Sequence, residues 1–267
     1  MKQIWKQTWR HRLAAALIQL LMVLAMAGVG IRMPVQAAEK NAVTQSGEMK
    51  VHFLDVGQGL SILAQSEGKT MIYDGGDRKT SRFVVSYLKE HGVSKIDYLI
   101  SSHYDADHMA GLIGCLNAFD VKNVISSNYV HTSKLYQSFV KAVKTDGLKM
   151  QHPAVGKTYK FGRGSFEILA PKTIEAKGSN NNSVAIKLMN GENSFVFTGD
   201  AEHESEAAMC NSSIDLSCDV LVPGHHGSAT ATSWDFLQKT VPEYAVISCG
   251  TNNKYGCLLY TSDAADD

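Results

Sequence analysis

The sequence is short of cysteine. Five cysteines occur among 267 residues, and no two are spaced as Cys-x-x-Cys. Structural zinc sites are commonly built from such pairs, so a zinc-ribbon or zinc-finger domain is not expected. Apart from the C-terminal tail considered below, Cys210 and Cys218 are the closest pair. Both a disulfide between them and two buried free thiols agree with this spacing.

The chain also lacks an excess of charge, an internal repeat and a low-complexity tract. It has 26 Lys and Arg and 26 Asp and Glu, of which 21 basic and 23 acidic residues lie within residues 38–256. No cluster of basic residues stands out. Proteins that bind nucleic acid regardless of sequence usually present a basic surface, so charge does not support nucleic acid as a partner.

Only one long hydrophobic run is present, and it lies near the N-terminus. Four basic residues precede an uncharged stretch from Leu13 to Ile31, and small residues follow at positions 35 and 37. This pattern predicts a cleaved signal peptide over residues 1–37, with an uncleaved membrane anchor as the alternative. Either way, the folded part is expected to be secreted or at the cell surface, with only this segment contacting a membrane. No second such run follows, which argues against a multi-span channel.

Three further segments follow this N-terminal stretch. Residues 38–48 are small and polar and are interpreted as a linker, and residues 49–256 as one domain. Residues 257–267 resemble the in-frame translation of an adapter oligonucleotide from sequencing libraries. They are expected not to belong to the domain, which would then be truncated at its C-terminus.

Strand-like and helix-like patterns mix along the domain. Apolar residues at helical spacing, with Gly or polar residues at the ends, predict helices near residues 83–91, 109–118, 133–143, 202–209 and 233–239. Short apolar or alternating runs predict strands near residues 51–56, 61–64, 70–73, 96–100, 121–125, 157–161, 166–170, 183–189, 195–198, 219–222 and 244–248. Two packed sheets with helices outside, a four-layer αββα sandwich of the α/β class, agree with this order.

One segment concentrates potential metal ligands. Four of them lie within six positions, directly after the strand predicted at 96–100: His103, Asp105, Asp107 and His108. Imidazole and carboxylate groups together suit a divalent transition metal, and four ligands so close along the chain suggest a second ion nearby. The alternative is a solvated polar loop.

Further acidic and imidazole residues follow predicted strands. These are Asp74, Asp200, His225 and His226. A carboxylate such as Asp200 can bridge two ions, and a histidine such as His225 can complete a second site. Each alone also fits ordinary turn chemistry, and Asp74-Gly75-Gly76 does so especially well.

In this order, the motifs resemble those of metallo-β-lactamase-fold hydrolases. The segments that carry the resemblance are 53–59 (FLDVGQG), 74–76 (DGG), 103–108 (HYDADH), 198–200 (TGD) and 224–228 (GHHGS). They look most like the ComEC-type subgroup, named for the hydrolase domain of bacterial DNA-uptake channels. The resemblance covers residues 49–256. It implies metal ligands at His103, Asp105, Asp107, His108, Asp200 and His225, with His226 beside them. We expect Asp107 and His226 to take part in catalysis, and Asp74, Asn181 and Asn182 to support the site.

The sequence departs from the superfamily pattern at several positions. Asp105 stands where a second histidine is usual, and the amides of Asn180, Asn181 and Asn182 stand where a further histidine is expected. Oxygen donors in place of imidazoles favour manganese or magnesium over zinc. One or two divalent ions are expected, because the altered site can bind its ion weakly or stay empty. Leu60 replaces a common aspartate, and the histidine and proline expected after Gly256 are absent.

The expected reaction is hydrolysis by metal-activated water, oriented by Asp107 and assisted at the leaving group by His225 or His226. The resemblance and the oxygen-rich site favour a phosphodiester substrate, small or polymeric. An ester or lactone is the second choice, and a β-lactam is disfavoured by the loss of histidines. The rival is a metal-binding or ligand-binding module that has lost catalysis.

Overall fold

The computed structural model describes residues 47–175, 179–251, 253 and 257. The predicted signal peptide and nearly all of the predicted linker and tail lie outside the described residues. Of the tail, Cys257 is described: it is 5% exposed and its backbone N–H donates to Asn253. All five cysteines are free thiols, so Cys210 and Cys218 form no disulfide. No helix in the described part is long and apolar enough to cross a membrane.

The first sheet has six strands in the order β1-β2-β3-β5-β7-β8. Their bounds are β1 Met49–Phe53, β2 Ile62–Ser66, β3 Lys69–Tyr73, β5 Tyr98–Ser101, β7 Val124–Ser126 and β8 Met150–Gln151. The first three strands are antiparallel neighbours, and β3, β5, β7 and β8 run parallel. Their connections contain helices α2 (Ser81–Glu90), α3 (Ala106–Ala118) and α4 (Lys134–Thr145).

The second sheet has the order β14-β13-β12-β11-β10-β9. The strands are β9 Thr158–Phe161, β10 Gly164–Ala170, β11 Ala185–Asn190, β12 Asn193–Phe197, β13 Val220–Val222 and β14 Tyr244–Ala245. The first four form antiparallel pairs, whereas β12, β13 and β14 are parallel. Helices α5 (His203–Cys210) and α6 (Trp234–Thr240) lie in the parallel half.

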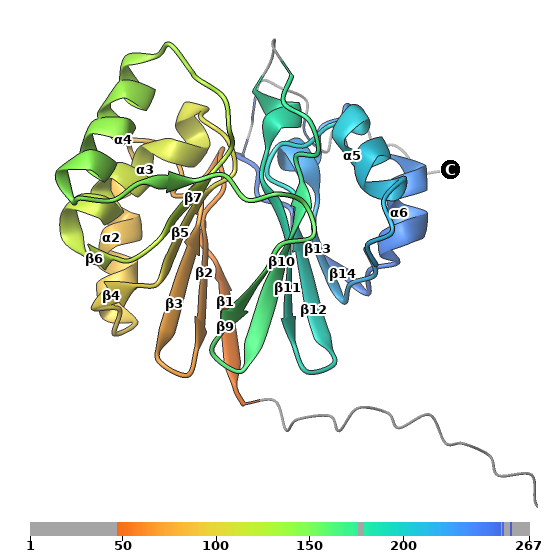
Figure 1. Ribbon diagram of the computed structural model, residues 1–267, viewed down its shortest axis with the longest axis horizontal. Coiled ribbons are helices and arrows are strands. Elements are labelled where there is room, and N and C mark those ends of the chain that lie inside the picture. The colour runs from red at the N-terminus through yellow and green to blue at the C-terminus, as the bar shows by residue number, and fades with distance from the viewer. Residues whose placement is uncertain (1–46, 176–178, 252, 254–256, 258–267) are drawn as a thin grey trace, which may run out of the picture. The chain divides into compact units, whose positions relative to one another are not determined.

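Helices α2, α3 and α4 lie outside one sheet, and α5 and α6 lie outside the other (Figure 1). The alternation of side chains along each strand accounts for these layers. In β5, Leu99 packs in a cluster with residues of α2, α3 and α4, while Ile100 packs in the cluster shared by both sheets. In β12, Phe197 joins that shared cluster and Val196 packs with residues of α5 and α6. Successive strand residues point to opposite faces, so each sheet buries both. The predicted αββα sandwich is confirmed.

The structure corrects some predicted boundaries. The strand expected at 96–100 is divided into β4 (Lys95–Ile96) and β5, because the Asp97 carboxylate between them accepts a hydrogen bond from the backbone N–H of Thr70. The strand expected at 121–125 is likewise divided into β6 (Asp120–Val121) and β7, and β4 and β6 pair as a small separate sheet. The last strand is limited to Tyr244–Ala245.

Candidate metal centre

The candidate ligands lie at the carboxyl ends of parallel strands from both sheets. Asp74 follows β3 and the segment beginning at His103 follows β5, while Asp200 follows β12 and the two histidines 225–226 follow β13. Because β3 and β5 are parallel, and β12 and β13 are parallel, each sheet sends two of these segments off the same end. Ligand sites in open α/β sheets characteristically lie beyond the carboxyl ends of the strands.

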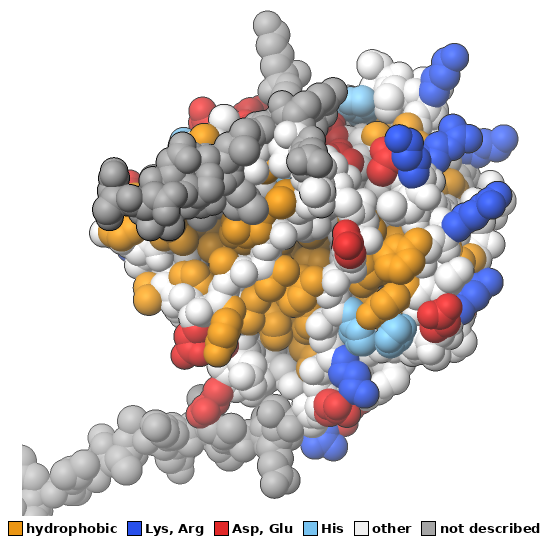
Figure 2. Space-filling model, turned by 180° about the vertical axis from the view of Figure 1, so that it is seen from behind, with side chains coloured by type: hydrophobic (Ala, Val, Ile, Leu, Met, Phe, Trp, Pro, Cys, Tyr) orange, Lys and Arg blue, Asp and Glu red, His pale blue; other side chains and the backbone are white. Residues whose placement is uncertain are grey.

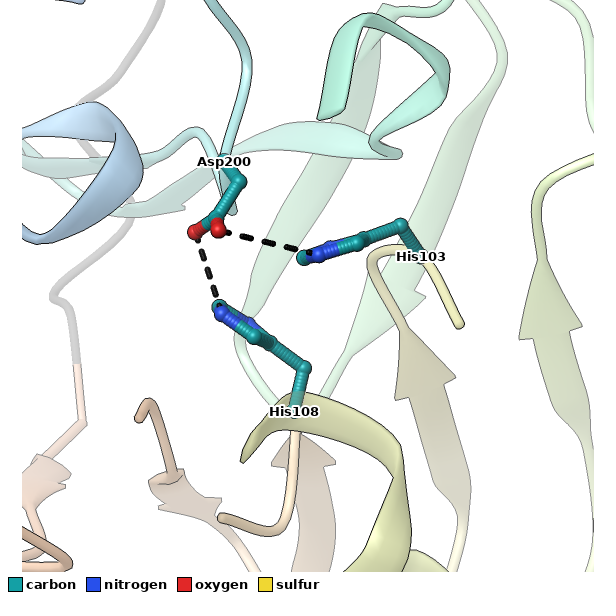
Figure 3. A group of neighbouring side chains, drawn as sticks. All are labelled: His103, His108 and Asp200. Atoms are coloured by element: carbon teal, nitrogen blue, oxygen red, sulfur yellow. Dashed lines mark ion pairs between the residues drawn. The ribbon is translucent and has the colours of Figure 1, made fainter. Parts of the chain in front are cut away.

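His103, His108 and Asp200 form the first group of potential ligands (Figure 3). The carboxylate of Asp200 lies between the two rings: one oxygen is 3.0 Å from His108 Nε2, and the other is 3.7 Å from His103 Nε2. Both imidazoles are fully buried. Nε2 of His103 has no hydrogen-bond partner among the described residues. A buried nitrogen without a partner is costly, and a metal ion would satisfy it.

Asp107, His108 and His226 form the second group, which shares His108 with the first. His226 Nε2 is 3.2 Å from His108 Nε2 and 3.4 Å from a carboxylate oxygen of Asp107. The same nitrogen is 3.7 Å from Asp200, whose carboxylate therefore lies between the two groups. The donor set of imidazoles and carboxylates fits one or two divalent ions.

Three hydrogen bonds orient the buried histidines. Nδ1 of His108 is 2.8 Å from the carboxylate of Asp74, and Nδ1 of His103 is 2.9 Å from the hydroxyl of Ser102. Nδ1 of His226 is 2.8 Å from the backbone carbonyl of Ser248. In each case Nε2 faces the centre, the arrangement that metal-ligating histidines adopt when a neighbour holds the other nitrogen. Asp74, which fits an ordinary turn in sequence, thus holds the candidate ligand His108 in place.

Burial and neighbouring charges together set the pKa values of these groups. Burial and the nearby His108 lower the pKa of His103, which favours the neutral imidazole. Burial alone would lower the pKa of His108, but the Asp200 and Asp74 carboxylates raise it well above its usual value. Burial alone would raise the pKa of Asp200, but His108 and His103 hold it well below its usual range. Burial alone would also raise the pKa of Asp107, but His226 and His108 lower it below its usual value. The carboxylates of Asp107 and Asp200 are therefore ionised and act as acceptors.

The two adjacent histidines have different surroundings. Both have positive φ, 48° for His225 and 56° for His226, a region that non-glycine residues rarely occupy. His226 turns to the second group, whereas Nδ1 of His225 lies 3.0 Å from Glu202. Nε2 of His225 is 4.0 Å from Asp200, so this ring lies beside the centre but in neither group.

The remaining predicted site residues are placed as follows. A carboxylate oxygen of Asp105 lies 3.8 Å from His103 Nε2, at the open side of the first group, with 41% of its side chain exposed. The side-chain oxygen of Asn181 accepts from the backbone N–H groups of Glu202 and Ser205 at the start of α5. Asn182 is buried, and its amide makes two hydrogen bonds to the backbone of Glu175. The two amides thus hold loops around the centre.

The glycine-rich segment 57–59 packs against the metal-ligand loop. Gly59 has a φ of 137°, and a Cβ at this position would lie 2.4 Å from the backbone oxygen of Asp107. The backbone N–H of Leu60 donates to that same oxygen, and the Leu60 side chain is buried between the sheets. The Leu60 side chain therefore occupies a core position and offers the centre no donor atom.

The residues that sequence reasoning missed are those that orient ligands. Ser102 contacts His103 and also donates its backbone N–H and hydroxyl to Asp74. Glu202 and the carbonyl of Ser248 contact the two histidines after β13. Ser102 could have been suspected from its place beside His103, whereas Glu202 and Ser248 carry no local signal.

Comparison with known proteins agrees with this geometry. The model of the metallo-beta-lactamase superfamily matches residues 54–251, so the chain belongs to that superfamily. Its relatives include ComE operon protein 3 of Bacillus subtilis, 29% identical over 79% of this chain and 29% of that protein. Recombination protein 2 of Haemophilus influenzae is 31% identical over 77% of this chain and 25% of that protein. The predicted ComEC-type membership is confirmed, and the chain spans less than a third of these relatives.

Solved structures are also similar. One is MEM-A1, a subclass B3 metallo-beta-lactamase isolated from a soil metagenome library, with a TM-score of 0.48 and 14% identity, covering 83% of this chain and 96% of that one. Another is the metallo-beta-lactamase fold protein YhfI from Bacillus subtilis, with a TM-score of 0.45 and 19% identity, covering 65% of this chain and 70% of that one.

Proposed function

We propose that this chain is an exported, metal-dependent hydrolase of phosphodiesters. One observation carries the proposal: two groups of potential ligands share His108 and meet at the carboxylate of Asp200. Two-metal sites of this kind serve phosphatases and nucleases, where they act on both the attacking and the leaving oxygen. The proposed export rests on the N-terminal pattern of residues 1–37.

The residues divide between two ions. His103, Asp105 and Asp200 would hold the first, and Asp107, His108 and His226 the second, with Asp200 reaching both. We propose His226 as a ligand because its Nε2 belongs to the second group, and we place His225 beside the first group at Asp200. The oxygen donors favour manganese or magnesium over zinc.

The protein supplies orientation and charge. When bound, divalent ions lower the pKa of a water molecule and stabilise negative charge on a phosphate. Asp107 has 31% of its side chain exposed, so it can accept a hydrogen bond from an attacking water. His225, held by Glu202 and facing Asp200, lies where it can contact the leaving group.

The test is metal content together with turnover in the full-length chain. We expect close to two ions per chain by elemental analysis after dialysis against mixed divalent metals, and hydrolysis of bis(p-nitrophenyl) phosphate. Asp107→Asn should lower kcat by about 100-fold or more, as expected for loss of a group that orients the nucleophile. The matched control is Asp235→Asn, at an exposed acid on α6.

The outcomes separate an enzyme from a binding module. A folded protein that binds metal but hydrolyses neither phosphodiesters nor esters would overturn the hydrolase in favour of a metal-binding module. Turnover of p-nitrophenyl esters or lactones without phosphodiester cleavage would keep the hydrolase but replace the substrate class. Absence of metal in folded protein would contradict both roles.

A further inference from the structure

Glu202 occupies the N-cap position of helix α5, but its side chain does not cap the helix. A side-chain oxygen at this position usually accepts a hydrogen bond from a backbone N–H of the first turn, and the Glu202 carboxylate makes no such bond. The side-chain oxygen of Asn181 accepts from the N–H groups of Glu202 and Ser205 instead. The carboxylate of Glu202 is therefore available for another contact.

That carboxylate turns toward the loop after β13. Its Oε1 lies 3.0 Å from Nδ1 of His225 and accepts a hydrogen bond of 2.7 Å from the hydroxyl of Thr230. It also accepts a bond of 3.3 Å from the amide of Asn180. Thr230 is held against the start of α5 in turn, since its backbone carbonyl accepts from the N–H of His203. Three donors converge on one oxygen, and this fixes where the oxygen lies.

The contact with Glu202 determines which nitrogen of His225 faces the metal centre. A carboxylate oxygen accepts and does not donate, so Nδ1 of His225 carries a hydrogen and Nε2 points away from Glu202. Nε2 lies 4.0 Å from the carboxylate of Asp200. The backbone N–H of His225 donates to the carbonyl of Gly199, so ring and backbone are both held at the end of β12. The side chain is 29% exposed, which leaves it accessible to a substrate.

We propose that Glu202 is a positioning residue: it keeps a hydrogen on Nδ1 of His225, so that Nε2 faces the leaving oxygen of the substrate. The proposal rests on the hydrolase proposed above. A ring held in this way can carry a second hydrogen on Nε2. As the bond from phosphorus to the leaving oxygen breaks, that hydrogen passes to this oxygen. The oxygen of a water molecule forms the new bond to phosphorus, and the water gives up one hydrogen to the solvent.

The first experiment observes the hydrogen directly and needs no turnover. Proton–nitrogen correlation spectra of the imidazoles in the metal-free full-length chain, at about pH 9 where ordinary imidazoles are neutral, distinguish hydrogen on Nδ1 from hydrogen on Nε2. The His225 signals are those lost in His225→Asn. We expect hydrogen on Nδ1 in wild type and in Glu202→Gln, which keeps an acceptor oxygen. In Glu202→Ala the hydrogen should move to Nε2, because the Thr230 hydroxyl, 3.2 Å from Nδ1, can then donate to it.

A histidine outside the centre provides an internal reference. Figure 2 shows histidine side chains grouped on the face opposite to that of Figure 1. His91 is exposed, and its Nδ1 lies 2.8 Å from the backbone carbonyl of Tyr87, so it should carry its hydrogen on Nδ1 in every variant. Unchanged His91 signals and an unchanged Tm show that a variant is folded.

The second experiment compares two leaving groups in the metal-loaded enzyme. Phenolate is a poorer leaving group than p-nitrophenolate and gains more from a donated hydrogen. In Glu202→Ala, kcat should fall about 10- to 100-fold for methyl phenyl phosphate and at most about threefold for methyl p-nitrophenyl phosphate, with KM within about twofold. Glu202→Gln should recover most of the loss. The matched control is Glu204→Ala, which removes an exposed carboxylate of α5 that accepts from Asn181, and it should behave as wild type with both substrates.

Failure of the positioning and failure of the hydrolase give different results. Hydrogen retained on Nδ1 of His225 in Glu202→Ala would overturn the proposal. An equal loss of kcat with both leaving groups would also overturn it, because a merely structural role slows both reactions alike. If the hydrogen moves in Glu202→Ala but wild type hydrolyses no phosphodiester with any divalent metal, the orientation of His225 by Glu202 is supported and the hydrolase is refuted.

Discussion

Replacing Asp74 tests how the centre is built. Its carboxylate is fully buried and accepts three hydrogen bonds, from the backbone N–H and hydroxyl of Ser102 and from Nδ1 of His108. In Asp74→Ala all three donors lose their acceptor. In the metal-free protein the neutral His103 ring can carry its proton on Nε2, so that the Ser102 hydroxyl turns and donates to Nδ1, 2.9 Å away, which leaves two buried donors unsatisfied.

The expected magnitude follows from those two donors. Each buried donor without a partner costs about 1–3 kcal/mol, so Asp74→Ala should lower the free energy of unfolding of the metal-free protein by about 2–6 kcal/mol. Asp74→Asn keeps an oxygen for the Ser102 N–H and should cost about half as much. Since His108 loses its orienting partner, metal affinity should also fall by about 10- to 100-fold in both variants.

Two assays separate these effects. Urea unfolding in EDTA reports stability without metal, and calorimetric titration with Mn²⁺ reports affinity. Asp120→Ala, which removes an exposed acid paired with exposed Lys122, serves as the control and should change stability by less than about 1 kcal/mol. The reasoning is refuted if Asp74→Ala unfolds within about 0.5 kcal/mol of wild type, the range of surface substitutions, or binds Mn²⁺ as wild type does.

Three further predictions concern the ligands, the packing and the charges. His226→Ala should reduce bound metal from two ions to one per chain by elemental analysis, because the second group loses a donor. Gly111→Ala should lower the free energy of unfolding by about 1–3 kcal/mol or more, since its Cβ would lie 1.8 Å from the backbone oxygen of Gly75. Lys187 holds the pKa of Asp215 at about 2, below the ordinary value of about 3.9. This pair therefore stabilises the fold above about pH 4 and is lost as the pH falls through 2, so Asp215→Asn should flatten that part of the stability profile in urea unfolding.

Each of these has a matched comparison. His225→Ala should retain two ions, because His225 lies in neither ligand group. In Gly114→Ala the new Cβ would lie close only to the side chains of Ser81 and Val85, and the Ser81 hydroxyl can rotate away, so the loss should be smaller. Lys187→Met removes the other member of the ion pair and should flatten the same part of the pH profile. If His225→Ala lost more metal than His226→Ala, or Gly114→Ala lost more stability than Gly111→Ala, the contacts behind these predictions would be contradicted.

Local patterns predicted the layers well. The alternation in β5 and the run of candidate ligands after it are local features, and the structure places that run directly after the carboxyl end of β5. The outcome at residues 225 and 226 is different, because identical neighbours carry no signal for which one turns inward. That choice depends on two consecutive positive-φ residues and on contacts with Ser248 and Glu202.

Long-range partners explain the other differences. Asp74 looks like a turn residue until Ser102 and His108 are brought against it from the next strand and helix. The side-chain oxygen of Asn181 accepts from the backbone N–H groups of Glu202 and Ser205 at the start of α5, and no local pattern predicts this contact. Asp97 lies within an apolar run, and only its bond to Thr70 shows why the strand ends beside it.

In the proposed two-metal site, the shared position of His108 and Asp200 makes metal binding at the two groups thermodynamically dependent. An ion in one group engages donors that the other also needs, so its arrival changes the affinity of the second, and the effect is reciprocal. Metal binding should therefore follow a cooperative or anticooperative isotherm instead of two independent steps. A chelator that removes one ion would alter the retention of the other, which makes the pair the unit that gains and loses metal.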